Sequence, residues 1–166
     1  MQFLTLRKTR AFSLIELVIV VVIIGIIAAI AIPRMSRGAA GAGDSSLASN
    51  LATLRKALEL YAAEHGNAFP TFANMPNALL RASDAAGTLK SSGTVTAADS
   101  TFPFGPYMRS IPALNVGTTA QRVNTIANGS TPDGAGGWMY DPATGNIIAN
   151  LANSAVDAAG KQYNTY

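Results

Sequence analysis

The chain has 166 residues, a formal net charge of +3 and no cysteine, which leaves room for one membrane helix and one modest soluble domain and excludes disulfide and thiol chemistry. Residues 1–37 hold five of the 12 Lys and Arg and one of the nine acids, so residues 38–166 hold seven basic and eight acidic side chains. The basic character belongs to the N-terminal end, and we expect no nucleic acid as a partner.

A long apolar run dominates the N-terminal end. From Leu17 to Ile32 no side chain is charged or strongly polar. Sixteen helical residues rise about 24 Å, and a helix starting at Ala11 would rise about 33 Å, near the hydrocarbon thickness of a bilayer. Basic residues before the run favour a cytoplasmic N-terminus and an extracytoplasmic remainder. A cleaved secretory signal or a plain signal anchor would show similar hydropathy, although residues 33–37 are a poor site for signal-peptide cleavage.

One carboxylate, Glu16, interrupts the beginning of this run. An acid at the edge of a membrane segment is costly to bury and usually has a function. A plain anchor gives no reason for it. The structural alternative is an acid that reaches the lipid headgroups or is protonated.

A family resemblance follows from these residues. The order Arg10-Ala11-Phe12-Ser13-Leu14-Ile15-Glu16, followed by the Val/Ile run, resembles the N-terminal signature of type IV pilins and type II secretion pseudopilins. The resemblance implies that a prepilin peptidase removes residues 1–11 between Ala11 and Phe12, and that the new amine of Phe12 is methylated. It also places Glu16 and Pro33 at positions where the family keeps Glu and Pro. The family usually has Gly before the cut, so Ala11 predicts slower cleavage, and a strict peptidase would leave the leader in place.

Assembly chemistry follows from this cleavage. The Phe12 amine would lie one helical turn from Glu16, and a subunit in a helical stack could pair Glu16 with the amine of its neighbour, which would set the register between subunits. Small residues between Gly25 and Ala31 would let such helices approach closely. Pro33 is expected to kink the helix, or alternatively to end the membrane segment. The Gly/Ala-rich stretch 38–43 reads either as a hinge or as a linker.

An amphipathic helix is predicted over residues 44–65. An apolar stripe recurs at spacings of three and four residues and needs a cover from the later chain, with members Leu47, Leu51, Leu54, Leu58 and Tyr61. Gly66 is a candidate C-cap. His65 is the only histidine, and we expect it to be a polar cap at the helix end rather than a base or metal ligand.

The later chain predicts a small sheet. Residues 77–86 are expected to form a short helix, 94–96 a weak hairpin, and 123–126 a strand or helix. The strongest hairpin signal joins 138–140 to 146–150 through the Asp141–Gly145 turn, with Trp138 and Tyr140 packing on the stripe. The polar tail to Tyr166 is expected to be loosely held. Segments 58–71, 102–114 and 137–150 resemble parts of secretion pseudopilins.

These expectations combine into an α+β, pilin-like architecture. A long N-terminal helix has a membrane-spanning first half (12–37) and an amphipathic second half, and it packs against a small C-terminal antiparallel sheet within a periplasmic domain, 38–166. We predict a structural, non-enzymatic subunit of a type II secretion pseudopilus or pilus-like filament, closest to the major pseudopilin, with no nucleophile, base and orienting group together. It would cross the inner membrane once, and its partners would be further copies, prepilin peptidase, the inner-membrane assembly machinery and lipid. The alternative is a signal-anchored extracytoplasmic binding module that does not polymerise.

The C-terminal acids bear on cofactors. The resemblance implies calcium as a possible ligand, since major pseudopilins often bind it in a C-terminal loop. Asp133, Asp141 and Asp157 lack the spacing of an EF-hand loop. We therefore expect Asp141 to start a turn, the other two to be solvated, and no cofactor, and we assign no metal ligands.

Overall fold

The computed structural model of the chain describes residues 12–91 and 97–166, apart from the side chains of 33–37, 39 and 40. The predicted leader, 1–11, and the predicted hairpin at 94–96 lie outside these residues. The chain divides into two compact units, residues 1–39 and residues 40–166.

Helix α1 runs from Leu14 to Glu64. It includes residues 38–43, so this stretch is helical rather than a linker. The helix also continues through position 33, and the kink predicted at Pro33 stays a prediction. Beyond Glu64 the chain turns sharply, because Gly66 and Asn67 both have a φ of 64°, in the left-handed region that Gly and Asn tolerate. The Asn67 N–H donates to the Ala62 carbonyl at 2.7 Å and satisfies part of the helix end.

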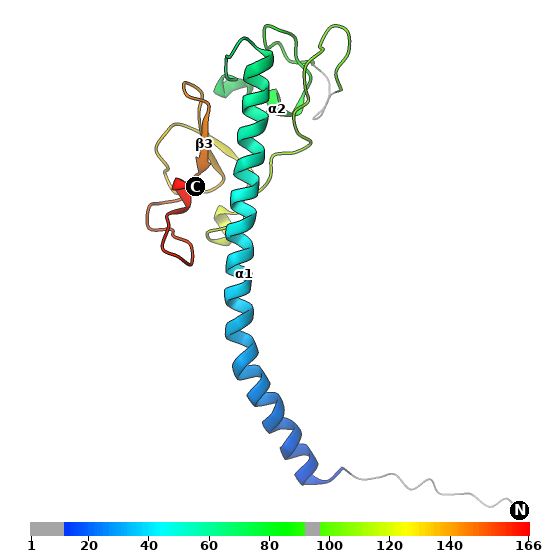
Figure 1. The fold of residues 1–166 in the computed structure, drawn as a ribbon, viewed down its shortest axis with the longest axis vertical. Coiled ribbons are helices and arrows are strands. Elements are labelled where there is room, and N and C mark those ends of the chain that lie inside the picture. The colour runs from blue at the N-terminus through cyan, green and yellow to red at the C-terminus, as the bar shows by residue number, and fades with distance from the viewer. Residues whose placement is uncertain (1–11, 92–96) are drawn as a thin grey trace, which may run out of the picture. The chain divides into compact units, whose positions relative to one another are not determined.

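The predicted stripe forms the core of residues 40–166. All five of its members are buried in one cluster with Trp138 and Tyr140, both 0% exposed. Helix α2, Asn77–Leu80, adds further apolar side chains to the same cluster. Figure 1 shows the sheet and α2 drawn beside the C-terminal half of α1. The expected packing of the aromatic pair on the stripe is confirmed.

The sheet has three strands in the order β1 (Ile126–Asn128), β2 (Trp138–Asp141) and β3 (Asn146–Ala149). The predicted hairpin is confirmed: β2 and β3 pair antiparallel. The Asp141 carboxylate starts the turn, where it accepts the Ala143 N–H at 3.0 Å. The α+β fold class is confirmed as well.

One strand pair differs from the antiparallel expectation, because β1 pairs with β2 in parallel. A parallel crossover usually needs a dozen or more residues, and only 129–137 join these strands. The connection is short because glycine lets it pass close to the preceding chain. A Cβ at Gly136 would lie 2.4 Å from Gln121 Cα, and one at Gly137 would lie 2.3 Å from the Thr125 carbonyl oxygen.

The helix predicted over 77–86 is shorter than expected and ends at Leu80. The chain beyond it is extended, because the Ser83 main chain exchanges two hydrogen bonds with Phe104. Asp84 then turns the chain by accepting the N–H groups of Ala86 and Thr88. The sequence Asp-Ala-Ala-Gly recurs at 157–160 with the same pattern, in which Asp157 accepts from Ala159 and Lys161.

The tail is held firmly, so the expectation of a loose tail was wrong. The Tyr163 hydroxyl donates to the Asp44 carboxylate at 2.9 Å, and the Arg55 guanidinium donates to the Tyr166 main-chain oxygen at 2.5 Å. Burial, followed by the bond to Asp44, raises the pKa of Tyr163 to about 12. The tail is thus held against α1 by two polar side chains, Asp44 and Arg55, that are not members of the apolar stripe.

Removing stripe contacts should destabilise residues 40–166. Leu54→Ala leaves a cavity in the buried cluster that also contains Trp138, and we expect a loss of about 2–5 kcal/mol in the free energy of unfolding. Leu60→Ala is the matched control, because Leu60 lies on the same helix with 48% exposure, and we expect a change below about 1 kcal/mol. Denaturant unfolding of the full chain in detergent micelles, followed by Trp138 fluorescence, measures both. Equal losses would contradict the assigned core.

Candidate functional site

The candidate site lies where the N-terminal helix begins. Phe12 precedes α1 and is 75% exposed. The Ser13 N–H donates to the Glu16 carboxylate at 3.0 Å, and the Leu17 N–H donates to the Ser13 carbonyl at 3.2 Å. Ser13 is therefore the N-cap residue, and Glu16 is the third residue of the helix. This is the return bond of a capping box, in which the acid satisfies the N–H of the cap residue.

The capping bond gives Glu16 a local role that the sequence interpretation missed. The spacing Ser13-x-x-Glu16 before an apolar run is the sequence signal for it. A carboxylate in the first turn also interacts favourably with the positive end of the helix dipole. Glu16 therefore helps to start α1 even in an isolated chain. The bond uses one carboxylate oxygen, Oε2, and does not neutralise the charge.

The helix that follows Glu16 has no apolar cover within residues 12–39. Within the described part of the chain, Leu14–Ile32 is the one stretch of helix long and apolar enough to cross a membrane, and none of its apolar window is buried. Its large side chains are between 45% and 79% exposed. Exposing so much apolar surface to water is unfavourable. This surface needs lipid or other apolar helices around it.

A Ser–His pair at the other end of α1 has the geometry of a catalytic dyad. His65 Nε2 lies 3.0 Å from the Ser83 hydroxyl oxygen, and His65 Nδ1 lies 2.7 Å from the Tyr61 carbonyl oxygen. Since that carbonyl only accepts, Nδ1 carries a proton and Nε2 faces the hydroxyl. However, Ser83 is 0% and His65 is 7% exposed, so a substrate cannot reach the hydroxyl in this structure.

The Ser–His pair instead fixes the segment after α2 to the end of α1. The His65 ring stacks on Tyr61 at 3.9 Å between centroids. Beside it, the Tyr107 hydroxyl donates to the Glu64 carboxylate at 2.6 Å, and burial, with that bond, raises the pKa of Tyr107. The expectation that His65 would be a helix-end cap was thus incomplete, because the ring is buried and bonded at both nitrogens.

The acids of the C-terminal half each take part in a turn of their own. In the described ranges, no group of three or more His, Asp or Glu side chains could hold a metal ion. In each of three turns, a carboxylate oxygen accepts a hydrogen bond from an N–H group of the same turn; the acids are Asp133, Asp141 and Asp157. These bonds lower the pKa of Asp133, and the Tyr166 hydroxyl bond, with the turn N–H groups, lowers that of Asp157.

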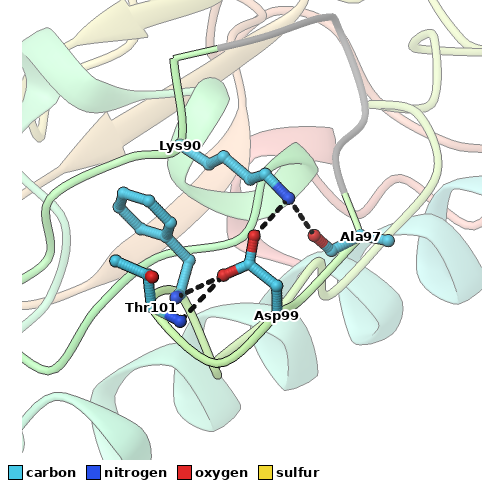
Figure 2. A network of polar contacts seen from close by, with 5 residues as sticks. Lys90, Ala97, Asp99 and Thr101 are labelled. Atoms are coloured by element: carbon cyan, nitrogen blue, oxygen red, sulfur yellow. Dashed lines mark hydrogen bonds and ion pairs between the residues drawn. The ribbon is translucent and has the colours of Figure 1, made fainter.

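A surface ion pair joins the described segments that lie before and after residues 92–96 in the sequence. Figure 2 shows Lys90 Nζ between the Asp99 carboxylate, at 2.7 Å, and the Ala97 carbonyl, at 3.1 Å. The other carboxylate oxygen of Asp99 accepts the N–H groups of Thr101 and Phe102, each at 2.9 Å. The bond from Lys90 and these N–H bonds lower the pKa of Asp99 to about 2.

Comparison with known families concerns the N-terminal segment. The family model of the prokaryotic N-terminal methylation motif matches residues 6–32. The match includes the predicted cleavage position between Ala11 and Phe12, the capping residues Ser13 and Glu16, and the apolar run to Ile32. Ala11 lies outside the described residues. No curated protein and no solved structure matches the chain.

The Asp99 carboxylate should make the free energy of unfolding decrease at acid pH. Because its folded pKa lies below the ordinary value of 3.8, its contribution is complete above about pH 4 and is lost as the pH falls towards 2. We expect Asp99→Asn to flatten this part of the profile of unfolding free energy against pH, measured by denaturant titration. Glu59→Gln, an exposed change on α1, should leave the profile unchanged. A wild-type slope retained by Asp99→Asn would contradict the assignment.

Proposed function

We propose that this chain, whose N-terminal methylation motif indicates a prepilin-peptidase-processed, type IV pilin-like protein, is a structural subunit of a type II secretion pseudopilus. The observation that carries the proposal is Glu16 at the start of an unburied apolar helix within that motif. The motif and the helix together suggest a single-pass membrane anchor. In the proposal, residues 1–11 are removed, the Phe12 amine is methylated, and residues 40–166 face the extracytoplasmic side.

The charge of Glu16 supports assembly beyond its capping role. A neutral N–H bond from Ser13 orients the carboxylate but leaves its charge in an apolar environment, which is costly. The methylated amine of a neighbouring Phe12 would neutralise it and would accept only one axial offset between subunits. Among the described contacts Oε1 of Glu16 has no partner, so the capping bond and the pairing with an amine are compatible.

Three observations favour a secretion pseudopilus over another pilus-like filament. Segments 58–71, 102–114 and 137–150 resemble pseudopilin segments, and they form the end of α1, part of the chain that covers it, and the β2–β3 hairpin. The chain also lacks the C-terminal cysteine pair that many true pilins carry. The buried hairpin and the fastened tail supply a compact domain without that disulfide.

The mature N-terminus tests the processing step. We expect intact mass measurement of chains isolated from cells to give a chain that begins at methylated Phe12. Ala11→Gly should raise the processed fraction, because Gly is the usual family residue before the cut. Chains that begin at Met1 in both proteins would remove the basis for the proposal.

Substitution at Glu16 tests assembly separately from helix capping. Glu16→Gln keeps a side-chain acceptor for the Ser13 N–H but removes the charge, and Glu16→Ala removes both. We expect both variants to be processed and inserted in the membrane yet to form at least about tenfold fewer filaments, counted by electron microscopy, because the absent charge removes the pairing between subunits. Full assembly by Glu16→Gln would show that capping alone explains the acid, and unchanged function in Glu16→Ala would favour the non-polymerising binding module.

A further inference from the structure

The two edge strands of the sheet, β1 and β3, differ in how far the rest of the described chain covers their main-chain groups. At the β3 edge, the Ile147 carbonyl accepts a hydrogen bond from the Arg55 guanidinium at 3.2 Å, and the tail lies beside the same arginine. Arg55 thus occupies a main-chain acceptor of that edge. An exposed strand edge is otherwise a template for pairing with another chain, and proteins usually cover it.

The β1 edge has no such cover from the described residues. On its inner side the Thr125 carbonyl accepts the Trp138 N–H, and the Gly129 N–H donates to the Tyr140 carbonyl, both at 2.9 Å. Main-chain groups alternate in direction along a strand, so those of Ile126 and Asn128 point to the outer side. In the described ranges no strand pairs there. This outer side offers N–H and C=O groups to a further strand.

A hollow of about 410 Å³ lies beside this edge. Leu80, Ile111 and Ile126 give it an apolar wall, and Arg109, Ser110 and Asn124 also line it. All of these residues belong to the unit 40–166. The hollow has room for one or two aliphatic side chains and is open to solvent on one side.

Arg109 supplies an unused positive charge at this hollow. It is exposed and makes no hydrogen bond or ion pair with a described residue. Two other cations of the same unit are engaged: Lys90 pairs with Asp99, and Lys161 lies 3.8 Å above the Tyr166 ring. A guanidinium next to main-chain donors favours a carboxylate that can be bound by two N–H groups at once.

We propose that the outer edge of β1 and the adjoining hollow bind an extended segment of a partner protein in which an acidic residue lies near an apolar one. The segment would pair with the main chain of Ile126 and Asn128, place its apolar side chain against Leu80 and Ile111, and bring its carboxylate to Arg109. This is strand addition with side-chain selection, in which the main chain contributes affinity and the pocket contributes specificity. The site goes beyond filament assembly and does not depend on Glu16.

A second copy of this chain fits the site less well. Three of the eight acids of residues 40–166 lie in helix α1: Asp44, Glu59 and Glu64. The other five accept N–H groups of their own turns: Asp84, Asp99, Asp133, Asp141 and Asp157. None of them lies in an extended segment that is free to pair as a further strand, so the proposal takes the acidic segment from a different protein.

Two matched peptides test the proposal on the full chain in detergent micelles. One has the sequence Thr-Val-Thr-Val-Thr-Asp-Thr, in which the second Val and the Asp are two positions apart and so share one face of a strand, and the other has Lys in place of Asp. We expect the acidic peptide to shift the amide NMR signals of Ile126 and Asn128 in a saturable way, and the Lys peptide to bind about tenfold more weakly. Arg109→Glu should reverse this order of affinity, while Lys56→Glu, the same charge change on α1, should preserve it.

Three results would overturn the proposal: equal binding of the two peptides, shifts that map away from β1, or an order of affinity that Arg109→Glu leaves unchanged. Concentration-dependent shifts of Ile126 and Asn128 without peptide would identify a second copy as the occupant instead. Filament counts for Arg109→Glu are measured in parallel. Normal filament assembly by Arg109→Glu together with a reversed peptide preference separates this site from the proposed function, whose own failure would appear only in the Glu16 variants.

Discussion

The apolar stripe on the C-terminal part of α1 is the constraint on which the rest of the soluble unit depends. A helix with five large apolar side chains on one face is not stable in water until that face is covered. Later segments supply the cover in turn: α2, the β2–β3 hairpin with Trp138 and Tyr140, and the tail. Even the polar contacts serve this purpose, since Arg55 and Asp44, at the edges of the stripe, hold the tail in place.

Glu16 has two separate effects, a hydrogen bond that caps its own helix and a charge that a neighbouring subunit can neutralise. The sequence pattern by itself does not distinguish them. The capping bond to Ser13 is worth about 0.3–1.5 kcal/mol, as other helix-end interactions are, and any side-chain acceptor of similar length can make it. Neutralising a charge in an apolar environment is worth more and needs a cation. Because the first effect acts within one chain and the second acts between chains, the acid can stabilise the helix start before assembly and select the register during assembly.

The sequence predicted correctly those structural features that depend on local periodicity and on turn-forming residues. The stripe from Leu47 to Tyr61 and the Asp141 turn belong to this class, and both are confirmed. Features that depend on long-range packing were missed: the parallel pairing of β1, which requires glycine at 136 and 137 against distant main chain, and the burial of His65 against Ser83. The fastened tail was missed because its partners Asp44 and Arg55 lie more than 100 residues away. The capping box at 13–16 was available from spacing alone.

The sheet edges show how a small domain with a short sheet can remain soluble yet keep one edge for binding. Covering both edges would require a second element like the tail, and the chain between α2 and β1 is instead used to cover α2 and the end of α1. A three-residue edge strand is too short to template extensive aggregation, so leaving it open carries a small risk. The same shortness limits main-chain affinity to a few hydrogen bonds. Selectivity at such an edge must then come from the adjoining side chains, and Arg109 is the one charged group lining the hollow there.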